Sequence, residues 1–62
     1  MNVEKYTDEE LYHELEQNER EWQYWANQDK RLKTVKYQLL WAMNITLRDR
    51  AELKRRGLPL YR

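Results

Sequence analysis

Residues 8–56 read DEELYHELEQNEREWQYWANQDKRLKTVKYQLLWAMNITLRDRAELKRR, a stretch of 49 residues that contains no Gly, Pro or Cys. Both of its ends carry helix-boundary signals. Thr7 followed by Glu10 is a capping-box pattern, in which each side chain satisfies a backbone N–H that the first turn leaves unpaired. At the far end, Gly57 favours the left-handed conformation that closes a helix, and Pro59 prevents its continuation. The sequence therefore predicts an all-α fold.

The length of 62 residues limits the chain to a single small helical domain at 1–62, with an N-terminal lead-in at 1–6 and a C-terminal tail at 57–62. A chain this short buries only about 60% of the surface of its unfolded form, so a solitary core is marginal. Because there is no Cys, we expect self-association or a partner chain to supply the missing stability. Charged residues make up 37% of the chain, but three Trp and five Tyr argue against disorder.

The charge of the chain divides sharply into two halves. Residues 1–29 hold nine acidic and two basic side chains, whereas residues 30–62 hold ten basic and two acidic ones. At the same place, Asn27 tolerates the left-handed conformation that ends a helix, and Asp29 is suited to cap the next one. We therefore predict an antiparallel helical hairpin, with helices at about 8–27 and about 30–56 whose opposite charges lie side by side.

Two other helical arrangements stay open from the sequence. Thr46 followed by Asp49 repeats the capping pattern, so a break near Asn44–Thr46 would give three helices. One unbroken helix would be about 73 Å long and would pair with a second copy in an antiparallel coiled coil. We favour a hairpin with an unbroken second helix, because the apolar period continues through residues 42–47 and packing usually overrides a weak local signal.

The second helix is apolar on nearly all faces around residues 39–47, which is more surface than one antiparallel neighbour can cover. We therefore expect the hairpin to dimerise into a four-helix bundle. The residues predicted to form the self-interface or partner interface, a set rich in the Trp and Tyr of binding hot spots, are Trp22, Trp25, Tyr37, Leu40, Trp41, Ile45 and Leu47. Asn18 interrupts the apolar stripe of the first helix, where it either fixes the helix register from a buried position or faces a gap near solvent.

The basic second half is a candidate surface for nucleic acid or for an acidic partner. The cations predicted to make such contacts are Arg48, Arg50, Lys54, Arg55 and Arg56. Against nucleic acid, the acidic first helix repels phosphate, and the isoelectric point of about 8.0 lies below the value of about 9 that is typical of dedicated binders. Nucleic-acid binding is therefore the alternative rather than the leading function.

The sequence shows no pattern for catalysis or for binding a metal or cofactor. His13 shares one helix with Glu9 and Glu16 but lacks the spacing of zinc motifs, and we interpret it as a solvated histidine. No nucleophile–base pair or Gly-rich phosphate loop stands out, so we expect a non-enzymatic protein without a cofactor. Because there is no apolar run of roughly 18 residues and no signal-peptide pattern, we expect no membrane contact and a cytoplasmic location. The predicted function is a small module that binds and modulates a partner protein.

Overall fold

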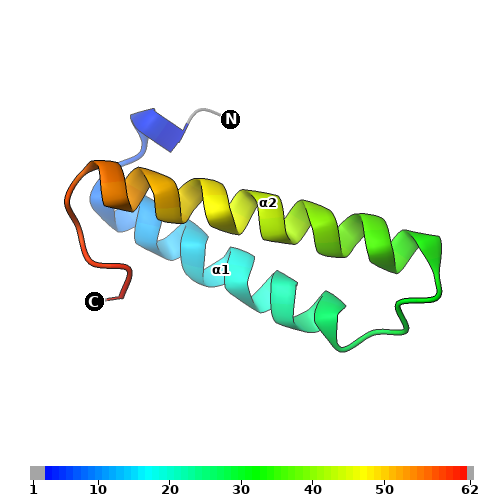
Figure 1. Ribbon diagram of the computed structural model, residues 1–62. Helices are drawn as coiled ribbons and strands as arrows, with labels where there is room; N and C mark the ends of the chain where they lie inside the picture. Colours follow the sequence, from blue (N-terminus) through cyan, green and yellow to red (C-terminus); the bar gives the residue numbers. More distant parts are fainter. Residues whose placement is uncertain (1–2, 62) are drawn as a thin grey trace.

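The computed structural model describes residues 3–61 and shows two helices folded back on each other (Figure 1). A 3-10 turn, η1 (Val3–Lys5), precedes helix α1 (Asp8–Ala26), and a loop at 27–32 leads into helix α2 (Lys33–Arg55). The helices lie side by side in opposite directions, so both ends of the chain lie away from the loop (Figure 1). No strand occurs within residues 3–61. The predicted helical hairpin is confirmed.

The helix ends that lie away from the loop have the predicted caps. The N–H of Thr7 donates to the carboxylate of Glu10 at 3.0 Å, and the N–H of Glu10 donates to the hydroxyl of Thr7 at 3.1 Å. At the end of α2, Gly57 has a φ of +73°, and the N–H groups of Gly57 and Leu58 donate to two carbonyls of the last turn. This arrangement is a Schellman motif, which satisfies carbonyls that the helix end would otherwise leave unpaired.

The loop end of the hairpin differs from the prediction. Asn27 has a φ of −92°, so α1 ends without a left-handed residue. Helix α2 begins at Lys33 instead of residue 30, after an extended Leu32 whose side chain makes no capping hydrogen bond. Asp29 does not cap α2, because its carboxylate accepts from the backbone N–H and the guanidinium of Arg31. A local turn bond thus replaces the predicted helix cap.

Helix α2 runs without a break through residues 44–46, so the three-helix alternative is wrong. Instead of capping a third helix, the buried Thr46 hydroxyl donates to the carbonyl of Ala42 at 2.7 Å. The chain reversal at 27–32 likewise contradicts the single long helix. Dimerisation into a four-helix bundle stays a prediction.

The apolar core lies near the ends of the chain. It consists of Val3, Leu11, Leu15 and Leu53, with Tyr6, Tyr12 and Leu58 packed against it. Toward the loop, Val35 and Ala42 are the buried apolar residues of α2. Between these two regions the helix interface is polar, because Asn18, Thr46 and Asp49 are buried there. Hydrogen bonds therefore accompany apolar burial in joining the two helices.

Candidate interaction surface

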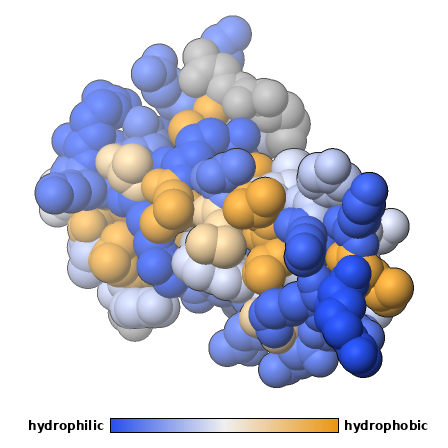
Figure 2. All heavy atoms as spheres, turned by 45° about the vertical axis from the view of Figure 1, so that its right-hand side comes forward, coloured by the Kyte–Doolittle hydropathy of each residue, from blue (hydrophilic) through white to orange (hydrophobic). Residues whose placement is uncertain are grey.

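A largely apolar row runs along the face of α2 that points away from α1. This row, called the outer seam, consists of Tyr37, Leu40, Asn44, Leu47 and Ala51, at alternating spacings of three and four residues. All five residues are exposed, including Tyr37 at 70%, Leu40 at 56% and Leu47 at 50%. In Figure 2, hydrophobic side chains lie open on the surface among hydrophilic ones. Apolar residues at this spacing on an open helix face are typical of surfaces that dock another helix.

The outer seam is exposed because a different row of α2 packs against α1. That buried row includes Val35, Ala42, Thr46, Asp49 and Leu53. With a rotation of about 100° per residue, it lies on the opposite side of the helix from the outer seam. Trp41, Met43 and Ile45 lie between the two rows, with Trp41 exposed and the other two partly buried. One side of α2 is thus covered within the chain and the other is open.

The predicted interface residues fall into two groups in the structure. Five belong to α2: Tyr37, Leu40 and Leu47 lie on the outer seam, and the exposed Trp41 and the partly buried Ile45 lie to one side of it. The other two are partly buried on α1, where they contact residues of the same chain. The guanidinium of Arg50 lies 5.7 Å from the ring centroid of Trp22, and the rings of Trp25 and Tyr24 meet edge-on at 4.9 Å. The α2 group is therefore the stronger candidate for an interface with another molecule.

The predicted cationic contacts are mostly engaged within the hairpin. Arg48 lies 3.4 Å from Glu14, and Arg50 lies 3.0 Å from Glu19, so both arginines form ion pairs across the two helices. Lys54, by contrast, is exposed on the surface. The opposite charges of the two halves do lie side by side, and phosphate groups would have to compete with these carboxylates for the arginines.

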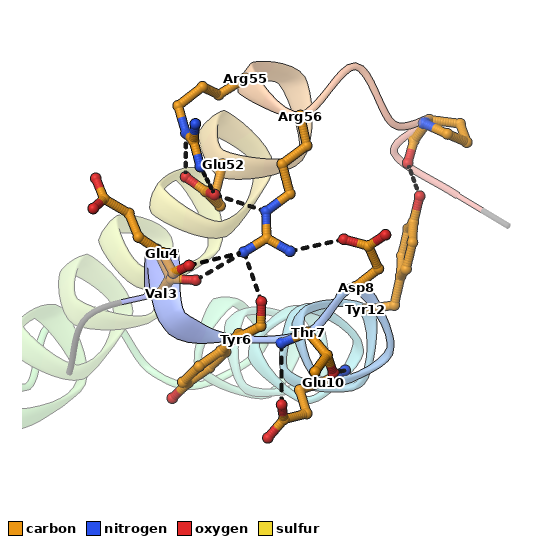
Figure 3. Close-up of polar contacts among 11 residues, drawn as sticks. Val3, Glu4, Tyr6, Thr7, Asp8, Glu10, Tyr12, Glu52, Arg55 and Arg56 are labelled. Carbon is orange, nitrogen blue, oxygen red and sulfur yellow. Dashed lines mark hydrogen bonds and ion pairs between the residues drawn. The ribbon is translucent and has the colours of Figure 1, made fainter.

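Arg56 joins three segments at the end of the hairpin (Figure 3). Its guanidinium donates to Glu52 at 2.7 Å, to Asp8 at 2.8 Å and to three backbone carbonyls within residues 3–6. Arg55 also binds the Glu52 carboxylate, but its side chain is 62% exposed, whereas that of Arg56 is 15% exposed. The hydrogen bonds from both arginines hold the pKa of Glu52 at about 2, well below its usual range. These contacts give Arg56 a structural role.

A buried carboxylate lies at the centre of the helix interface. Asp49 is fully buried, and its Oδ2 accepts a hydrogen bond from Nδ2 of Asn18 at 2.7 Å. Burial and the nearby carboxyl of Glu14 raise the pKa of Asp49 to about 6, although the Arg48 guanidinium acts in the opposite direction. Asn18 is therefore buried and bonded across the interface, and it does not face a gap near solvent. Its role in fixing the helix register stays a prediction.

The sequence interpretation missed the roles of Asp49 and Glu52. They are the only acidic residues in positions 30–62. Asp49 follows Ala42 by seven residues and so shares its buried face, and Glu52 precedes Arg56 by four residues, a spacing that favours an ion pair on a helix. These spacings indicate that both carboxylates have partners within the chain. A count of charges in each half does not reveal such pairing.

An open groove with a volume of about 290 Å³ lies beside the C-terminal tail. Its lining residues are Glu19, Trp22, Gln23, Ala26, Arg50 and Tyr61. The tail is held by Tyr12, whose hydroxyl donates to the carbonyl of Pro59 at 2.5 Å (Figure 3). Because Glu19 and Arg50 are paired with each other, the groove presents a neutralised ion pair beside aromatic rings.

His13 is exposed, and its Nε2 lies 3.1 Å from the side-chain nitrogen of Gln17. Within residues 3–61, no group of three or more His, Cys, Asp or Glu side chains is arranged to hold a metal ion. Over the same residues, neither helix combines the length and the apolar character needed to cross a membrane.

Comparison of the chain with protein-family models, with curated proteins and with solved structures gave no match. A functional proposal for this hairpin therefore depends on the chemistry of its own surface.

Proposed function

We propose that this chain is a small non-enzymatic interaction module, which binds and modulates a partner protein through the outer seam of α2. The observation that supports this proposal is the exposure of Tyr37, Leu40 and Leu47 in one row, with Trp41 beside them. Exposed apolar patches on small proteins commonly mark interaction sites, and Trp and Tyr are enriched among the residues that dominate binding energy. Covering these half-exposed side chains would contribute on the order of 1 kcal/mol each.

The partner is either a second copy of the hairpin or a different protein. A second copy on this face would give the homodimeric four-helix bundle expected from the sequence. Sedimentation equilibrium at micromolar concentration distinguishes the two cases, because only the first predicts a mass of two chains.

Photo-crosslinking in the native host tests the outer seam directly. A benzophenone amino acid replaces the exposed Trp41 in one variant and Gln17, on the exposed face of α1, in the control variant. We expect a crosslinked partner at position 41 and none at position 17. Crosslinks at position 17 alone would place the binding surface on α1 and contradict the proposal. Once crosslinking has identified the partner, adding the purified chain to that protein tests whether the chain changes its activity.

Nucleic-acid binding is the second candidate, and the exposure of Lys33, Lys36 and Lys54 on α2 is the observation that favours it. Titration against duplex DNA at several salt concentrations tests this function, which requires an affinity that falls steeply with salt. No binding at about 50 mM salt would eliminate it.

A further inference from the structure

We infer that the partner presents an acidic amphipathic helix, with apolar residues facing the outer seam and Asp or Glu along both of its borders. This inference rests on the proposed function. The outer seam follows the heptad repeat of a coiled coil, with Tyr37, Asn44 and Ala51 at one core position and Leu40 and Leu47 at the other. The seam residues 37–51 span about two heptads, and Lys33 and Lys54 occupy the next core positions, one heptad before Leu40 and one heptad after Leu47.

The borders of the outer seam hold cations and no anion. One border row is Lys36, Met43 and Arg50, and the other is Trp41, Arg48 and Arg55. Lys33 and Lys54 add exposed positive charge near the two ends of α2. The acidic residues of α2, Asp49 and Glu52, are both buried and hydrogen-bonded within the chain. Arg48, Arg50 and Arg55 are paired with Glu14, Glu19 and Glu52. The exposed Lys33, Lys36 and Lys54, which form no ion pair with a described residue, therefore supply the positive charge that a docked helix meets toward both ends of α2, and this charge favours carboxylates on the partner.

A second copy of the hairpin fits this surface poorly. If two α2 helices paired in parallel, each exposed lysine would lie beside its own copy. If they paired antiparallel about the centre of the seam, Lys33 and Lys36 of one helix would lie near Lys54 of the other. Like charges at these lysines oppose pairing in both orientations. The exposed face of α1 is acidic, with Glu9 and Glu16, but it has no apolar row that would cover the seam.

Asn44 sets a further condition on the partner. It is exposed and lies at the middle of the outer seam, with apolar core positions on both sides. A docked helix would bury this amide, and a buried amide without a hydrogen-bond partner costs about 1–3 kcal/mol. The partner helix therefore has one polar residue at the middle of its own apolar stripe, and this pairing fixes the register of the complex.

Two designed peptides test the inference against the full-length chain. Each has about 21 residues in three heptads, with Leu at the core positions and Asn at the central one. The acidic peptide has Glu at all border positions, and the basic peptide has Lys there. Fluorescence anisotropy of labelled peptides measures binding at about 50 mM and about 500 mM NaCl. We expect the acidic peptide to bind at least about tenfold more tightly at low salt, with a smaller ratio at high salt.

Variants of exposed residues separate the apolar contribution from the charge contribution. Leu40→Asn with Leu47→Asn removes apolar surface and is expected to weaken both peptides at least about tenfold. Replacing Lys33, Lys36 and Lys54 by Glu reverses the exposed charge along the seam, and we expect this variant to prefer the basic peptide. Circular dichroism checks that each variant retains the helical content of the unmodified chain.

The other possible outcomes of these experiments contradict different parts of the inference. Equal binding of the two peptides, or a preference that the lysine replacements do not change, would overturn the acidic partner and leave the outer seam as an interface. If the unmodified chain is a dimer and the combined replacement Leu40→Asn with Leu47→Asn dissociates it, the acidic partner would be overturned in favour of a second copy. Stronger binding to anionic phospholipid vesicles than to the acidic peptide would overturn it in favour of a membrane surface. Failure of both peptides and of crosslinking at Trp41 would instead refute the proposed function.

Discussion

Replacing Asp49 by Asn tests whether the buried carboxylate destabilises the hairpin at neutral pH. The substitution preserves the size of the side chain and an oxygen that accepts from Asn18, but it removes the charge. The pKa of Asp49 is raised from 3.8 to about 6 by burial and by the carboxyl of Glu14. Two pH units correspond to at most about 3 kcal/mol, and water close to a two-helix interface reduces this value. We expect the variant to be more stable by about 1–2 kcal/mol at about pH 7.5.

The sign of the pH dependence follows from proton binding. The native carboxyl of Asp49 keeps its proton up to about pH 6, whereas in the unfolded chain it loses the proton near pH 3.8. Between these values the native state binds more protons, so the free energy of unfolding of the unmodified chain falls as the pH rises. The Asn side chain does not titrate. The gap in stability should therefore be small near pH 4 and reach its full size above about pH 7.

Urea unfolding followed by circular dichroism, from about pH 4 to about pH 8, measures this gap. Glu52→Gln is the matched control, because Arg55 and Arg56 lower the pKa of Glu52 to about 2. The stabilisation from Glu52 is present above its unfolded pKa of 4.5 and is lost as the pH falls toward 2, so this control should be less stable at neutral pH. A loss of stability in Asp49→Asn at neutral pH, or a gap that stays constant with pH, would refute the reasoning.

Three further substitutions test the helix ends. Arg56→Lys should lower Tm by about 5–10 °C in thermal denaturation, because an ammonium group cannot reach two carboxylates and three carbonyls together. The control Arg55→Lys, at the exposed neighbouring residue, should lower Tm much less. Gly57→Ala should cost about 1 kcal/mol in urea unfolding because of the positive φ. No atom lies within 4 Å of the added Cβ, so Gly57→Asn, which tolerates this backbone conformation, should cost less. Leu32→Asp should add about 0.5–1 kcal/mol by capping α2, a gain that Leu32→Ala should not reproduce in the same assay.

The outer ends of the hairpin were predictable because their signals act over a few residues. The bonds between Thr7 and Glu10 span three positions, and the left-handed backbone at Gly57 depends on its own side chain being absent. The caps at the loop were mispredicted for an equally local reason. Asp29 has Arg31 two residues away, and bonding to it replaces bonding to the start of α2. Arg31 is closer to Asp29 in sequence than the first turn of α2 is, and it therefore takes the carboxylate that the prediction assigned to the helix cap.

The partners of the arginines were not predictable, because they depend on how the two helices align. Arg48 and Glu14 are 34 positions apart, and Arg50 and Glu19 are 31 apart. The apolar period shows which face of each helix is buried, but it does not show which turn of one helix meets which turn of the other. The outer seam did not require that information. Three of its residues, Tyr37, Leu40 and Leu47, were among the interface residues predicted from the apolar period, whereas Asn44 and Ala51 were not.

Helix α2 has polar residues within both its buried row and its outer seam, and the two rows can be altered separately. On the buried row Asp49 is hydrogen-bonded to Asn18, whereas on the outer seam Asn44 is exposed. Asp49→Asn should therefore change the free energy of unfolding without changing the affinity for the acidic peptide. Leu40→Asn with Leu47→Asn should weaken the binding of the acidic peptide, with only the small loss of stability, about 0.5 kcal/mol per site, that the lower helix propensity of Asn causes. Because a ligand that binds only the folded state stabilises it, the acidic peptide should raise the Tm of the unmodified chain and leave that of the seam variant unchanged. A loss of stability in the seam variant well above this propensity effect would mean that the outer seam contributes to the stability of the hairpin itself.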